Sequence, residues 1–171
     1  MHLYPAPLKK WQLRLHNIVI HADASPSGCV AWYNHSTENH RIRKVRPAIK
    51  NERFGVQRME MLAIYFALVD NLKNINRIIG KHRKRRIVVA VRSDSKSTVE
   101  QLLGLAQIRD SLMRKISSAI AKLLAKARYT IIFDNLERSR NIAGILIERE
   151  RRKERERMMD GLQIAPLCIT T

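Results

Sequence analysis

Three acidic residues interrupt otherwise apolar stretches of this sequence. Asp23 ends the run Ile-Val-Ile-His-Ala-Asp, Glu60 lies between two methionines in a helical stretch, and Asp94 follows the apolar run at 87–91. A carboxylate among aliphatic side chains is costly unless a positive partner meets it, and a divalent metal ion is such a partner. Oxygen ligands of this kind suit Mg²⁺ or Mn²⁺. We therefore interpret Asp23, Glu60 and Asp94 as candidate metal ligands and catalytic residues.

Each acid also has a purely structural interpretation. Asp23 can open the turn that follows it by accepting hydrogen bonds from backbone N–H groups, and Glu60 can be stabilised by the dipole near a helix N-terminus. Sites in α/β sheets form at strand ends, however, and acids from three elements could converge there. Such a cluster can hold a pair of ions about 3.5–4 Å apart, which together clamp a phosphodiester.

The elements that must position these acids alternate in a pattern typical of an α/β domain. Period-two and period-3.6 patterns predict strands at 17–23, 29–33, 41–48, 87–91 and 129–133, and helices at 57–72, 98–105, 107–126 and from 140 or 141 onward. The first three strands should form an antiparallel meander. The predicted organisation is an N-terminal arm (1–16), one domain (17–150), and a charged helical extension with an apolar tail (151–171), which could dock on the domain or on a second copy.

The charge of the chain predicts a polyanionic partner. Lys and Arg total 33 against 15 Asp and Glu, a formal net charge of +18. Nucleic acid is the first interpretation and an anionic membrane surface the second. The two cysteines, Cys29 and Cys168, show no zinc-ligand spacing, which favours a reducing compartment. Because no window has the length of a membrane span and no signal peptide is visible, we expect a soluble, cytoplasmic protein without membrane contact.

The acidic motifs resemble, in order and spacing, the first three acidic motifs of the type 1-like ribonuclease H family. The motifs are Ile-His-Ala-Asp-Ala-Ser around Asp23, Gln-Arg-Met-Glu-Met-Leu-Ala around Glu60, and Arg-Ser-Asp-Ser-Lys-Ser-Thr-Val around Asp94. Their wording looks most like the ribonuclease H domains of reverse-transcribing elements. The resemblance covers residues 17–150. It implies a ribonuclease H-like fold with a five-stranded mixed sheet flanked by helices.

The resemblance also implies a role for each acid. Asp23 would bridge two Mg²⁺ or Mn²⁺ ions, Glu60 would bind the ion on the leaving-group side, and Asp94 would complete the cluster. The stretch 138–146 resembles the family's fourth motif, Asn-x-x-Ala-Asp-x-Leu. Aligning it on its alanine places Gly144 at the last acid, whereas aligning it on its asparagine places Ile145 there.

Neither Gly144 nor Ile145 has a side chain that binds metal. Glu148, one helical turn on, or Glu137 or Asp134 in the preceding loop, could substitute as the fourth ligand. The family's mobile histidine and the basic protrusion of some members have no counterpart at the same places, and the nearest basic block is 81–86.

Residues that flank the acids, together with nearby cations, are the predicted nucleic-acid contacts. Recognition of an RNA–DNA hybrid would depend on contacts to 2′-hydroxyls and to the phosphates of the DNA strand. The predicted contacts are Ser25, Asn51, Gln57, Arg58, Ser95, Lys96, Arg138, Arg140, Lys81, Arg83, Lys84, Arg85 and Arg86.

Three functions are compatible with these observations. The first is a metal-dependent endonuclease that hydrolyses the RNA strand of RNA–DNA hybrids. The second is a ribonuclease H-fold protein with weakened or lost catalysis, which binds structured RNA or a nucleoprotein assembly such as the ribosome. The third is a relative of integrases or resolvases that acts on DNA, for which a different helix around the glutamate is expected.

Overall fold

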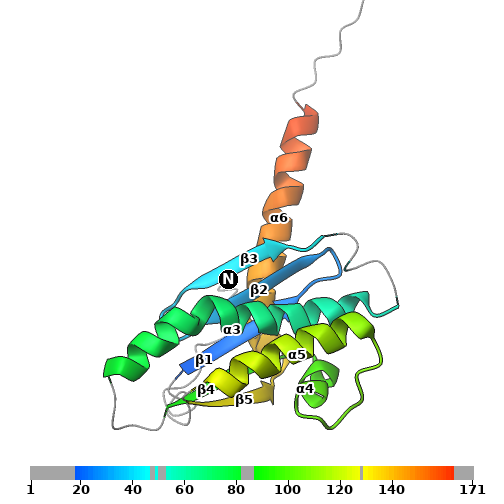
Figure 1. Cartoon of the computed structure of the whole chain (residues 1–171). Coiled ribbons are helices and arrows are strands. Elements are labelled where there is room, and N and C mark those ends of the chain that lie inside the picture. The colour runs from blue at the N-terminus through cyan, green and yellow to red at the C-terminus, as the bar shows by residue number, and fades with distance from the viewer. Residues whose placement is uncertain (1–17, 47–48, 50–52, 82–86, 128, 164–171) are drawn as a thin grey trace, which may run out of the picture.

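A computed structural model describes residues 18–46, 49, 53–81, 87–127 and 129–163. Five strands form one mixed sheet in the order β3-β2-β1-β4-β5 (Figure 1). They are β1 (Ile18–Ala24), β2 (Cys29–Asn34), β3 (His40–Lys44), β4 (Val88–Ser93) and β5 (Thr130–Asn135). The first three are antiparallel, and β4 and β5 run parallel to β1 and to each other. The predicted mixed sheet is confirmed.

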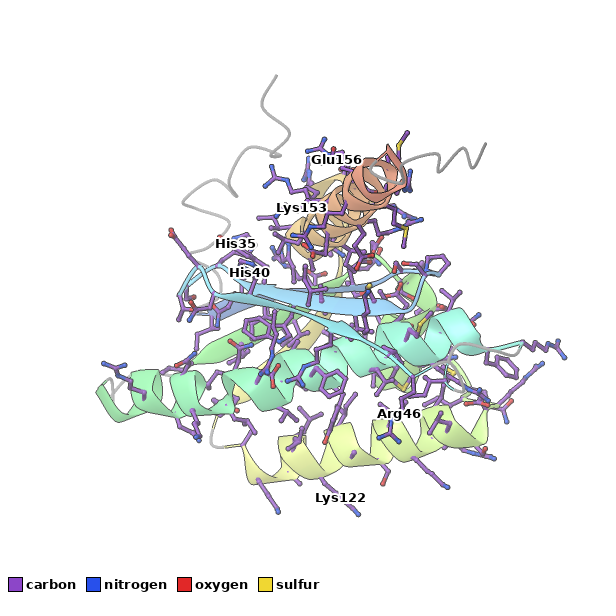
Figure 2. The ribbon with its side chains drawn as sticks, turned by 90° about the horizontal axis from the view of Figure 1, so that it is seen from above. His35, His40, Arg46, Lys122, Lys153 and Glu156 are labelled. Carbon is purple, nitrogen blue, oxygen red and sulfur yellow. The ribbon has the colours of Figure 1, made fainter. Side chains whose placement is uncertain are left out.

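Helices cover both faces of this sheet. They are α3 (Gly55–Lys81), α4 (Lys96–Leu102), α5 (Ser111–Lys126) and α6 (Ile142–Gln163), with a short 3₁₀ helix, η1 (Arg138–Arg140), before α6. Helix α3 packs on one face with α5 outside it, and α6 crosses the opposite face (Figure 2). Every residue of the central strand β1 is buried, which explains its aliphatic composition. None of the helices in the described ranges is both long and apolar enough to cross a membrane.

Three element boundaries differ from their predictions for local reasons. Helix α3 continues to Lys81, and Ile75 remains fully buried beyond the predicted end at residue 72. Helix α5 begins at Ser111, since the Asp110 side chain accepts a hydrogen bond from the Met113 N–H and caps the helix. Strand β3 ends at Lys44, and its exposed basic side chains are typical of a sheet edge.

The strand register brings the carboxyl ends of β1 and β4 together. His21 of β1 pairs with Arg92 of β4, so Asp23 and Asp94 follow at neighbouring ends of parallel strands. The hairpin after Asp23 closes at Gly28, whose φ of 91° is a conformation that glycine adopts without strain. Topology therefore positions two of the three predicted acids at one edge of the sheet.

The two faces of the sheet bury different cores. The α3 side holds a large aliphatic cluster, with Ile20, Ile64 and Val89 fully buried. The apolar cluster on the α6 side is smaller, and most of its side chains are small, including Ala31 and Ala143. Small side chains let the first turns of α6 approach the sheet closely. Beyond them α6 extends past the sheet, as Figure 1 shows, and Lys153 and Glu156 lie on that extension (Figure 2).

Candidate metal centre and its surroundings

Three carboxylates from three elements meet at the carboxyl end of β1. Asp23 belongs to β1, Glu60 lies near the start of α3, and Asp94 follows β4. Ligand oxygens of all three lie within 4.8 Å of one another. Oxygens bound to one divalent ion lie at most about 4–5 Å apart. The three predicted metal ligands are therefore brought together at a spacing that suits one ion.

Burial makes this cluster costly without a cation. Asp23 and Glu60 are each only 8% exposed, whereas Asp94 is half-buried. Burial, then the charge of Glu60 and a hydrogen bond with Asp94, raises the pKa of Asp23 to about 9. Burial, then the charge of Asp94, raises the pKa of Glu60 to about 8, although Arg138 opposes this rise. Near neutral pH these two groups retain protons that a bound cation would displace.

The Glu60 side chain also shows an unfilled coordination position. Its Oε2 atom is buried and has no hydrogen-bond partner among the described residues. Such an unpaired buried acceptor costs about 1–3 kcal/mol. Together with the convergence of three carboxylates, this oxygen fits a divalent ion held by Asp23, Glu60 and Asp94.

Asn141 connects the metal centre to the start of α6. This buried side chain donates from Nδ2 to Ala22 O at 3.1 Å and to Asp94 Oδ1 at 3.0 Å. It therefore orients one candidate ligand and ties α6 to the end of β1. The sequence carried a signal for Asn141 in its fourth motif, but that signal did not indicate this contact.

A buried histidine pair supports the same helix start, and the sequence analysis missed it. Ile142 N–H donates to His21 Nδ1 at 3.2 Å, so the neutral His21 ring carries its proton on Nε2 and donates it to His35 Nε2 at 3.1 Å. Burial lowers the pKa of His21 to about 2 and that of His35 to about 4. The pair is therefore neutral and structural near pH 7.

Gly144 occupies the place from which α6 faces Asp23. A Cβ atom built on Gly144 would lie 2.8 Å from Asp23 Oδ2. The structure thus favours the alignment that places Gly144, rather than Ile145, at the fourth acid. A cavity of about 350 Å³ opens beside it, with Arg138, Glu148 and Arg151 in its lining. Of the three predicted substitutes for the fourth acid, only Glu148 lines this cavity.

The other two substitutes are engaged elsewhere. Asp134 lies within β5, not in the predicted loop, and pairs with Arg92 at 3.0 Å. Glu137 pairs with Arg140 at 3.2 Å. Neither belongs to the cluster of three carboxylates.

Several predicted nucleic-acid contacts form hydrogen bonds within the domain. Arg58 is buried and donates from Nε and Nη2 to Asp110 at 3.0 and 2.7 Å, which ties α3 to the start of α5. Ser25 Oγ accepts from Cys29 N in the hairpin turn. Ser95 Oγ lies 2.8 Å from Thr98 Oγ1 at the start of α4.

The remaining predicted contacts vary in exposure. Lys96 and Arg138 are exposed, Gln57 is half-buried, Arg140 is exposed but ion-paired, and Lys81 is the last residue of α3. Asn51, Arg83, Lys84, Arg85 and Arg86 lie outside the described residues, as do the N-terminal arm and the apolar end of the tail.

Comparison with known proteins shows similarity in structure. No family model and no curated protein sequence matches this chain. LC11-RNase H1, solved in complex with an RNA/DNA hybrid, is 16% identical over 72% of this chain and 88% of its own, with a TM-score of 0.56. RNase H1 from Halobacterium salinarum is 17% identical over 74% and 89%, also with a TM-score of 0.56. The N-terminal RNase H domain of a Mycobacterium tuberculosis protein is 18% identical over 73% and 85%, with a TM-score of 0.50. The predicted ribonuclease H-like fold is confirmed.

Proposed function

We propose that this chain is a metal-dependent endonuclease that hydrolyses the RNA strand of RNA–DNA hybrids. The observation that carries the proposal is the convergence of Asp23, Glu60 and Asp94 around a buried, unpaired Glu60 oxygen. The fold supports it, because LC11-RNase H1 binds such a hybrid in its crystal. The net charge of +18 supports a polyanionic substrate.

The three carboxylates and Asn141 form the candidate binding site for a divalent cation. Asp23, Glu60 and Asp94 would hold it, and Asn141 orients Asp94 for this purpose. A bound Mg²⁺ or Mn²⁺ would supply an activated water and polarise the phosphodiester. The sequence predicts two ions. Three carboxylates converge for the first, while the position that would serve a second, on the α6 side of Asp23, is occupied by Gly144.

Positively charged side chains on the exposed side of α5 could bind a nucleic-acid strand. Arg114, Lys115, Lys122 and Lys126 are exposed there, and Figure 2 shows Lys122 pointing away from the body of the domain. These residues can contact phosphates, but contacts to phosphates do not distinguish one base sequence from another. Because the motif wording is most like that of reverse-transcribing elements, we propose hybrids produced by reverse transcription as the substrate class.

A second candidate is a ribonuclease H-fold protein that binds RNA, or an assembly such as the ribosome, without cleaving it. Gly144 in place of a fourth carboxylate favours this function. Both functions place the protein with nucleic acid in the cell interior, and neither requires a membrane.

One assay separates the two candidates. The full chain is incubated with Mg²⁺ or Mn²⁺ and an RNA–DNA hybrid labelled on its RNA strand, beside an RNA duplex of the same sequence. We expect the wild type to cleave the hybrid, and Asp94→Asn to bind it without cleavage. If both proteins bind the hybrid and leave it intact, the binding function replaces the endonuclease.

A further inference from the structure

We propose that the cavity beside Gly144 receives a phosphate group of the nucleic-acid strand and that the chain binds one divalent ion rather than two. This inference deepens the proposed function and rests on it. Arg138 and Arg151 would hold the phosphate where a second ion would otherwise lie.

The metal centre has three carboxylate ligands within the described part of the chain. The described residues place three carboxylates within 4.8 Å of one another, and Glu60 contributes the unpaired oxygen of that set. Asp23 is the member that faces α6. A second ion on that side would share Asp23 and would need a further carboxylate from α6.

Helix α6 presents a glycine, Gly144, to Asp23. Asn141 fixes the start of the helix to Ala22 and Asp94, so the direction in which position 144 points is set by packing. That direction leads to Asp23 Oδ2, only 2.8 Å from an added Cβ. Glycine supplies no ligand there, and any larger residue would require the Asp23 side chain to shift. Gly144 also lines the cavity of about 350 Å³.

Two arginines lie in the wall of this cavity. Arg138 and Arg151 line it together with Ser139, and all three can donate hydrogen bonds to an anion. No ion pair of either guanidinium is found within the described part of the chain, whereas Arg140 and Arg152 are both paired. Guanidinium groups bind phosphate through paired N–H donors and cannot lose their charge. They can therefore neutralise a phosphate in place of an ion.

Two carboxylates, those of Asp23 and Glu148, line the same cavity and oppose an anion there. Asp23 already belongs to the cluster of three, whereas Glu148 is exposed. A carboxylate there could serve as a displaced ligand for a second ion, so the experiment must separate a phosphate pocket from a two-ion site.

The first test counts bound Mn²⁺ per full chain by isothermal titration calorimetry, with electron paramagnetic resonance to measure free ion. We expect one ion for the wild type and for Glu148→Gln. Gly144→Asp should bind two ions, while the matched variant Gly144→Asn, of equal size but uncharged, should bind one. Circular dichroism checks that both variants fold.

Each count has a distinct meaning. Two ions in the wild type would overturn the inference and leave the endonuclease proposal intact, and a drop to one in Glu148→Gln would then identify the second ligand. A single ion in Gly144→Asp would also overturn the inference, because position 144 would not face the ion. No ion in the wild type would overturn the proposed function itself.

The second test measures hybrid binding at several salt concentrations with Ca²⁺ in place of Mg²⁺, and gels confirm that the hybrid stays intact. Arg138→Ala and Arg151→Ala should each reduce the slope of log Kd against log salt by about 1. Arg152→Ala is the control, since this arginine lies on the same helix, is paired with Glu156 and does not line the cavity. Wild-type slopes in both cavity variants would overturn the inference, whereas a wild type that does not bind the hybrid would overturn the proposed function.

Discussion

Raising the pH from 6.5 to 8 should destabilise the metal-free domain, and Mg²⁺ should remove the effect. In the folded state the pKa of Asp23 is about 9 and that of Glu60 about 8, against 3.8 and 4.5 for unperturbed groups. Within this window the unfolded chain has lost two protons that the folded chain retains. Stability therefore falls by up to about 1.4 kcal/mol per pH unit for each retained proton. Over 1.5 pH units the loss is at most about 4 kcal/mol.

The opposite sign applies to the buried histidines. His21 and His35 have pKa values lowered to about 2 and about 4, so below pH 6.5 the unfolded chain gains protons that the folded chain does not. Between about pH 4.5 and 6.5 the two protons that the histidines bind in the unfolded chain offset the two that Asp23 and Glu60 retain in the folded chain. The free energy of unfolding therefore changes little with pH in this range. Below about pH 4 the carboxyl groups of the unfolded chain are protonated too, so they no longer offset the histidines, and stability falls as the pH falls. Asp110 adds to this fall, because its pKa is lowered to about 2, chiefly by Arg58.

Urea unfolding of the EDTA-treated protein from pH 5 to 9, with and without Mg²⁺, measures this profile. Glu60→Gln should be more stable than the wild type at pH 8 without metal, with roughly half the slope. Asp134→Asn is the matched control, because this carboxyl group is 47% exposed, lies outside the cluster and should leave the slope unchanged. A flat profile above pH 6.5 in the metal-free wild type would refute the reasoning.

Three further predictions follow from other contacts. Asp110→Ala should lower the free energy of urea unfolding by about 3–5 kcal/mol, because it leaves Arg58 buried without a partner and removes the α5 cap; a loss below 1 kcal/mol would contradict this. Asn141→Ala should weaken Mn²⁺ binding in calorimetry while the circular dichroism spectrum stays native, and unchanged affinity would show that Asp94 does not need this contact. Trp32→Phe should cost about 1.5–3 kcal/mol in the same urea experiment, since it removes the 2.8 Å hydrogen bond to Asp70, and a neutral result would mean that the Arg43 pair satisfies that carboxylate alone.

Much of the fold could be predicted because the local patterns are strong. The aliphatic runs at β1 and β4 and the helical stripe around Glu60 identify their elements without tertiary information. Boundaries were less predictable where a single contact decides them. Asp110 starts α5 by capping it, and its side chain is held by Arg58, which is distant in sequence. Helix α3 continues past residue 72, where Ile75 is buried.

The sequence by itself determined which residues are the candidate ligands, because only a few acids stand inside apolar elements and their order is informative. It also predicted a polyanionic partner through net charge. The tertiary structure decided which side chains meet. Arg58 was predicted to contact nucleic acid, and packing turns it toward Asp110. His21, for which the sequence predicted no role, accepts a hydrogen bond at the start of α6.

Gly144 illustrates the division most clearly. Two alignments of the fourth motif were equally compatible with the sequence, since a shift of one residue changes only which side chain is compared. On a helix, that same shift rotates the side chain by about 100°. Only the docking of α6, through Asn141 and His21, determines that position 144 points at Asp23, so closely that an added Cβ would lie 2.8 Å from Asp23 Oδ2.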